Sequence, residues 1–94
     1  MKSMRDILEK AEQLVRDEGW FPRLGTGMLE RLFQAAGHRF GHVVAKDVPE
    51  LHAVLEHLRE HLETRQLAQW EHAPGRTIDD VLTALAGAKG KLVA

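Results

Sequence analysis

Residues 47–66 have the sequence DVPELHAVLEHLREHLETRQ, which contains the strongest helix signal in the chain. Asp47 can cap a helix that has Pro49 in its first turn, where the missing proline N–H would have no partner anyway. Apolar residues then recur at three- and four-residue steps, on one stripe of the helix. They are Leu51, Val54, Leu55, Leu58 and Leu62. The segment therefore predicts an amphipathic helix over about 48–66 that buries this stripe.

Three further segments, at about 4–18, 27–36 and 78–87, repeat the same helical spacing of apolar residues. Residues 38–46 lack that spacing and predict an irregular connection. The pattern therefore predicts an all-α protein, a compact bundle of four principal helices.

Short polar residues mark the expected helix starts. Ser3 with Asp6, and Thr77 with Asp80, have the spacing of a capping box, in which each residue's side chain accepts a hydrogen bond from the other's backbone. Thr26 is the expected cap of the segment at 27–36.

The composition is that of a folded globular chain. Of its 94 residues, 44% are hydrophobic and 29% are charged, which predicts one domain over 1–87 and a frayed tail over 88–94. The absence of cysteine excludes disulfides, thiolate catalysis and cysteine-bound zinc, and it favours a reducing, cytoplasmic location. Since no apolar run approaches the roughly 18 residues of a membrane span, no membrane association is expected.

Two local features suggest ligand chemistry but have simpler explanations. Trp20 and Phe21 follow the first predicted helix, and we interpret both as closing the core, because the neighbouring sequence lacks the polar residues that ligand stacking would need. Gly25 and Gly27 are typical of a phosphate-binding loop, but the lysine and the preceding strand of that motif are absent.

The chain contains six histidines, so a metal site has to be considered. His57 and His61 have the four-residue spacing that lets two imidazoles share one ion. The residue after His57 is Leu58, where a zinc protease would have glutamate. Counted around the helix, His57 falls on the solvent side and His61 at the margin of the buried stripe. The two remain weak metal candidates, and we expect no metal and no other cofactor.

Charge is distributed unevenly, although the formal net charge is only −1. Residues 23–46 carry four basic side chains against one acidic one and form a candidate nucleic-acid contact. These basic side chains are Arg23, Arg31, Arg39 and Lys46. Residues 47–72 carry six acidic side chains against two basic ones. The solvent side of their helix is the expected protein-binding surface, through Glu56, Glu60 and Glu63.

The stretch from Trp70 to Thr77 has the pattern Trp-x-x-x-Pro-Gly-Arg-Thr, and Gly-Trp closes the first helix at residues 19–20. This combination resembles a signature of small uncharacterised helical proteins of high-GC bacteria and their phages. The resemblance implies a helical domain and supplies no catalytic residues. From the residues themselves, we expect Trp70 to pack beneath the turn at Pro74 and Gly75, and Arg76 to bond nearby carbonyls or the acidic helix.

No nucleophile and base can be paired in this sequence, so we do not expect an enzyme. The observations favour a small non-catalytic helical module that regulates or binds a protein partner, and they leave self-association as a homo-oligomer open. A nucleic-acid-binding module that uses residues 23–46 is the alternative. A histidine-based metal site or a small enzyme is the third reading.

Overall fold

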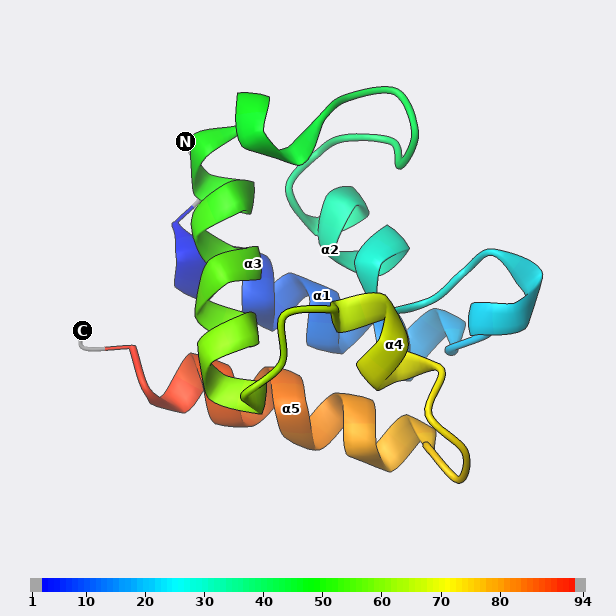
Figure 1. Ribbon diagram of the computed structural model, residues 1–94. Helices are drawn as coiled ribbons and strands as arrows, with labels where there is room; N and C mark the ends of the chain where they lie inside the picture. The colour runs from blue at the N-terminus through cyan, green and yellow to red at the C-terminus, as the bar shows by residue number, and fades with distance from the viewer. Residues whose placement is uncertain (1–2, 93–94) are drawn as a thin grey trace.

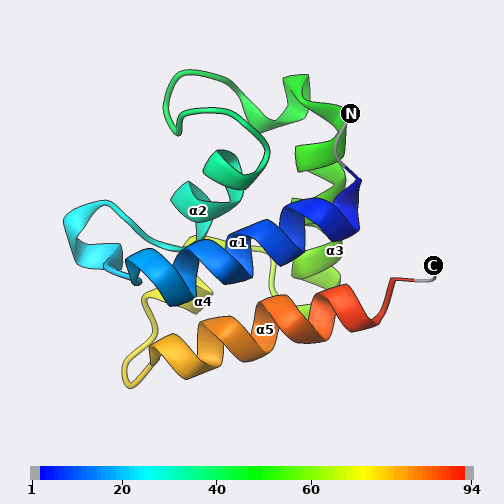
Figure 2. The same ribbon diagram turned by 180° about the vertical axis from the view of Figure 1, so that it is seen from behind.

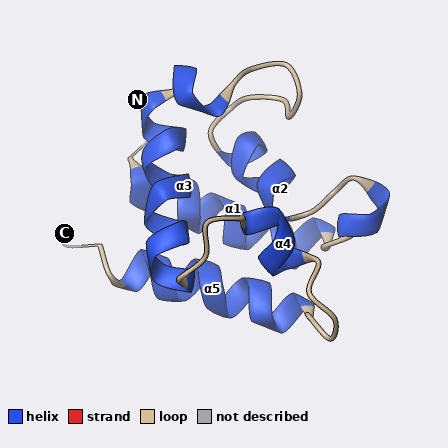
Figure 3. Ribbon diagram, viewed as in Figure 1, coloured by secondary structure: helices blue, strands red, loops and turns tan. Residues whose placement is uncertain are grey.

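Five α-helices contain most of residues 3–92, which is the part of the chain that the computed structural model describes (Figures 1 and 3). They are α1 (Met4–Glu18), α2 (Met28–Ala35), α3 (Pro49–Leu62), α4 (Leu67–Glu71) and α5 (Ile78–Gly90). Two 3₁₀ turns, η1 (Pro22–Leu24) and η2 (Ala45–Asp47), lie in the connections. Within the described residues there is no strand beyond two isolated bridges, which confirms the predicted all-α class.

The long helices pack around α1. In both views α1 and α5 lie side by side and run in opposite directions, while α3 crosses them near one end (Figures 1 and 2). Helix α2 packs against α1, and α4 contacts α2. The core between these helices contains the apolar stripes that the helical period predicted. Its largest fully buried side chains include Ile7, Leu8, Val15, Met28, Leu32, Leu51, Leu58 and Leu85.

Two predicted helix ends were wrong. Helix α3 stops at Leu62 rather than near residue 66, because Glu63 adopts a left-handed conformation with φ 53°. The chain then forms a separate short helix, α4, between the segments predicted as helices at about 48–66 and 78–87. Helix α5 continues to Gly90, so the predicted tail begins inside a helix whose Ala88 is fully buried. Residues 93–94 of that tail lie outside the described residues.

The two predicted capping boxes are confirmed. The Asp6 amide donates to Ser3 Oγ at 3.1 Å, and the Asp80 amide donates to Thr77 Oγ1 at 3.3 Å. Both boxes are local pairs three residues apart, which is why the sequence reveals them.

The predicted caps at Thr26 and Asp47 were wrong. Gly27 and Val48 occupy the N-cap positions of α2 and α3, and neither supplies a side-chain acceptor. Thr26 instead pairs with Phe21 through the backbone, and Asp47 lies in η2. The start of α2 therefore needs acceptors from elsewhere in the chain.

Arg31, predicted as a nucleic-acid contact, is a buried structural residue with only 4% of its surface exposed. Its Nη2 atom donates to the carbonyls of Glu18 at 3.2 Å and of Gly19 at 3.1 Å, where α1 ends. A cation there satisfies the last carbonyls of the helix and complements the negative end of its dipole. Arg31 therefore does not share an exposed surface with the other three cations of residues 23–46.

Replacing Arg31 should destabilise the fold. We expect Arg31→Met to lower the free energy of unfolding by about 2–3 kcal/mol, because the carbonyls of Glu18 and Gly19 at the end of α1 lose a charged donor. Urea unfolding monitored by circular dichroism measures the change. Arg39→Met, at an exposed position, is the control and should stay within about 0.5 kcal/mol of the wild type. Equal stability of the two variants would contradict the capping role.

Candidate functional site

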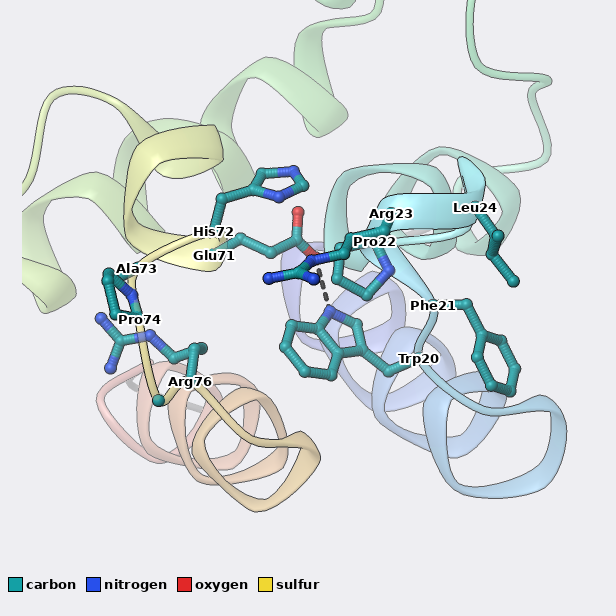
Figure 4. Close-up of a pocket in the computed structure, with 11 residues that line it drawn as sticks. Trp20, Phe21, Pro22, Arg23, Leu24, Glu71, His72, Ala73, Pro74 and Arg76 are labelled. Carbon is teal, nitrogen blue, oxygen red and sulfur yellow. Dashed lines mark hydrogen bonds between the residues drawn. The ribbon is translucent and has the colours of Figure 1, made fainter.

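A cleft of about 360 Å³ opens between the η1 turn and the connection from α4 to α5 (Figure 4). Residues 20–24 form one wall and residues 71–76 form the other. The two walls are distant in the sequence and meet only through tertiary packing. We call this hollow the η1 cleft.

Glu71 lies at the base of the η1 cleft with only 3% of its surface exposed. Its Oε2 atom accepts a hydrogen bond from Trp20 Nε1 at 2.6 Å (dashed in Figure 4) and another from the backbone amide of Met28. The Met28 amide is at the positive, N-terminal end of α2, which favours a carboxylate. Glu71 thus supplies one of the acceptors that the start of α2 lacked.

Gly27 is required by the close approach of this carboxylate. A Cβ atom at residue 27 would lie 2.5 Å from Glu71 Oε2, a separation that any larger residue would have to relieve. The Gly27 amide donates to Glu30 Oε2 at 2.9 Å, so a second carboxylate serves the same helix end. Of the two glycines that suggested a phosphate loop, Gly27 therefore makes room for the chain's own Glu71 carboxylate, whereas Gly25 has a left-handed backbone with φ 81° and no such neighbour.

Two donor side chains reach over the η1 cleft from opposite walls. Figure 4 shows Arg23 extending from η1 and His72 from the end of α4, both on the side of the cleft above Trp20. Both residues are exposed, and within residues 3–92 neither side chain makes a hydrogen bond or an ion pair. Their donors are therefore available to a ligand.

Arg76 stabilises the second wall through its contacts with Trp70. Its guanidinium carbon lies 4.0 Å from the centroid of the Trp70 ring, and its Nε donates to the Trp70 carbonyl at 2.8 Å. Stacking and hydrogen bonding together hold the Pro-Gly turn against α4. Trp70 is half-buried and packs against the core.

The prediction that Phe21 closes the core was wrong, whereas Trp20 does pack against it. Phe21 is 50% exposed and Leu24 is 80% exposed, at the outer edge of the η1 cleft. The backbone of Phe21 pairs with Thr26, which closes a turn that carries both side chains outward. The polar neighbours that the local sequence lacked come from residues 71–76, about fifty positions later.

Of the acidic residues predicted to bind a partner, Glu56 and Glu60 lie on α3 and Glu63 is its C-cap, and none of the three lines the η1 cleft. Glu56, Glu60 and Glu63 are exposed, and Glu56 Oε1 is 2.6 Å from Arg59 Nη1. The exposed cations Arg39 and Lys46 lie on the connection between α2 and α3, apart from the cleft.

His57 and His61 face α5, although the helical angle placed His57 on the solvent side. His57 Nε2 is 2.7 Å from the Ala88 carbonyl oxygen, and the His61 ring fills the space above Gly87. The buried Nδ1 of His61 has no hydrogen-bond partner in the described part of the chain. Burial, then the charge of Lys91, then His57 lower the pKa of His61 below its ordinary value of 6.5. No cluster of three potential metal ligands occurs in residues 3–92.

These features define a small all-α protein with a half-apolar, donor-rimmed cleft. The chain belongs to a family of unknown function (DUF6197), whose model matches residues 1–91. No match was found to a curated protein or to a solved structure. Within the described residues, no helix is both long and apolar enough to span a membrane. The family match agrees with the resemblance to an uncharacterised helical family.

Removing the Glu71 carboxylate should weaken the packing of α4 against α2. We expect Glu71→Ala to cost roughly 2–4 kcal/mol of unfolding free energy, because the Trp20 indole and the Met28 amide lose their acceptor. Chemical denaturation measures this loss. The matched control Glu60→Ala, on the exposed face of α3, should change stability by less than about 0.5 kcal/mol. A Glu71→Ala variant as stable as this control would contradict the assignment.

The stability of the protein should decrease as the pH falls below about 6.5. Because the pKa of His61 is lower in the folded state, the unfolded chain binds the proton first, and stability is lost between 6.5 and the folded pKa. Denaturation at a series of pH values gives the free energy of unfolding as a function of pH. In this pH window its slope should be smaller for His61→Gln than for the wild type. His52→Gln, at an exposed site on the same helix, should keep the wild-type slope. An unchanged slope for His61→Gln would contradict the prediction.

Proposed function

We propose that this protein is a small, non-catalytic, cytoplasmic module that binds a protein partner through the η1 cleft. The observation that carries the proposal is the exposure of Phe21 and Leu24 beside a formed cleft. Large apolar side chains that stay exposed next to a concave surface are typical of protein-interaction sites. Aromatic and arginine side chains are enriched at the centres of such interfaces, and Trp20 and Arg23 are of these types.

The side chains of the η1 cleft support binding rather than catalysis. Its lining residues include no serine, threonine or lysine that could act as a nucleophile. The one carboxylate, on Glu71, already accepts two hydrogen bonds from the protein itself.

A protein partner is also favoured over a nucleic acid. Of the four cations of residues 23–46, Arg31 is buried, and Arg23 lies apart from Arg39 and Lys46. Three dispersed cations release few counterions, so duplex DNA should bind only in the weak non-specific range, with Kd about 10⁻⁴ to 10⁻⁶ M. A protein interface needs only about 800 Å² per partner.

The exposed face of α3, with Glu56, Glu60 and Glu63, is the second candidate surface for the same partner. Charge reversal there should slow association if this face steers the partner towards the molecule. This face of α3 does not combine exposed apolar groups with a cavity, so we propose that the main contact is at the η1 cleft.

Quantitative affinity capture from a lysate of the encoding organism tests the proposal. We expect Leu24→Asp to reduce recovery of one specific protein at least tenfold, because it places a charge in the apolar contact. Val44→Asp changes an exposed apolar residue elsewhere and should leave recovery unchanged. If recovery of the partner falls only when Glu56, Glu60 and Glu63 are replaced by lysine, the main contact lies at α3 and not at the η1 cleft. Recovery that is insensitive to all these variants, or that disappears with nuclease, would overturn the proposal.

A further inference from the structure

We propose that the occupant of the η1 cleft is an acidic, apolar segment of the partner protein. An apolar side chain of that segment packs against Trp20 and Pro22, and a neighbouring aspartate or glutamate pairs with Arg23 and His72. This inference rests on the proposed function and adds the chemistry of the partner's contacting segment.

The charge of the η1 cleft carries the first part of the inference. Glu71 is its one acidic lining residue, and the Glu71 carboxylate is buried and engaged by Trp20 and Met28. Arg23 has no ion-pair partner in residues 3–92, although the chain as a whole is slightly acidic. A carboxylate entering the cleft would therefore meet unpaired donors and no exposed acidic group within it. Because Arg23 and His72 are exposed, such an ion pair contributes more to the specificity and rate of association than to its free energy.

The apolar surface of the η1 cleft carries the second part. In Figure 4 Trp20 lies below the Arg23 side chain and Pro22 lies beside it, while Phe21 and Leu24 point outward from η1, away from Glu71. An apolar side chain of a partner would remove the apolar surface of Trp20 and Pro22 from water, which favours binding. A ligand that is only anionic would leave these groups exposed, so the cleft fits a segment that carries both kinds of side chain.

A phosphate ligand fits this arrangement less well. The strongest local anion site is the N-terminus of α2, and Glu30 and Glu71 already occupy its amides. Arg76 is held by Trp70 through stacking and a hydrogen bond on the second wall. Arg23 and His72 remain, which suits one carboxylate better than a nucleotide or a nucleic-acid backbone.

Titration of the isotope-labelled full chain at about 150 mM salt tests the inference. The probes are three synthetic peptides and random duplex DNA. The peptides are repeats of Glu-Leu-Asp-Phe, of Lys-Leu-Arg-Phe and of Glu-Ser-Asp-Ser. We expect only the first peptide to saturate the protein, with shifts of the Trp20 indole N–H signal and of the amides of residues 21–24. Arg23→Glu should weaken this binding at least tenfold, whereas the matched control Arg39→Glu, outside the cleft, should not.

The other outcomes overturn the inference and separate it from the proposed function. Equal binding of the basic peptide, or binding of the acidic peptide without apolar residues, would show that the chemistry of the occupant is wrong. The same holds if none of the peptides binds up to about 1 mM. DNA binding at the cleft, or self-association abolished by Arg23→Glu, would assign a different occupant. If partner capture still depends on Leu24 in these cases, the proposed function stands and only this inference fails.

Discussion

The carboxylate of Glu71 holds together three segments that are distant in the sequence. It accepts from the Trp20 indole, which follows α1, and from the Met28 amide, which begins α2, while its own residue ends α4. A donor that is buried without a partner costs about 1–3 kcal/mol, and the Met28 amide is such a donor if the carboxylate is removed. The position of α4, the glycine at residue 27 and the base of the η1 cleft all depend on this one group.

Arg31 has a similar role to Glu71, at the other end of the turn that joins α1 to α2. The two are the buried charged residues of the described chain, and each lies at a helix terminus of the favourable sign. Arg31 fixes the end of α1, and Glu71 fixes the start of α2. The intervening turn is thereby held at both ends, so its tip can expose Phe21 and Leu24 without losing its shape. A binding surface on a loop held by a rigid scaffold is a common arrangement in proteins.

The η1 cleft joins the two stretches of sequence that carry the family resemblance. Trp20, which follows Gly19, is the first residue of one wall. Residues 71–76 form the other wall, and Trp70 holds it through Arg76. In the sequence each stretch has a local explanation, as a helix end or as a turn with its anchor. Together they make a surface that neither predicts alone, because the Glu71 to Trp20 hydrogen bond spans 51 positions.

The sequence by itself determined the helical class, the buried stripes and the capping boxes at Ser3 and Thr77. These features depend on neighbours three or four residues apart, which helical geometry brings together. Only the tertiary structure decided that Arg31 is buried, that His61 faces α5 and that Phe21 is exposed. A hydrogen bond or charge pairing across 12 to 51 positions leaves no periodic trace in the sequence. The helices were therefore predictable from local spacing, and the η1 cleft required the packed fold.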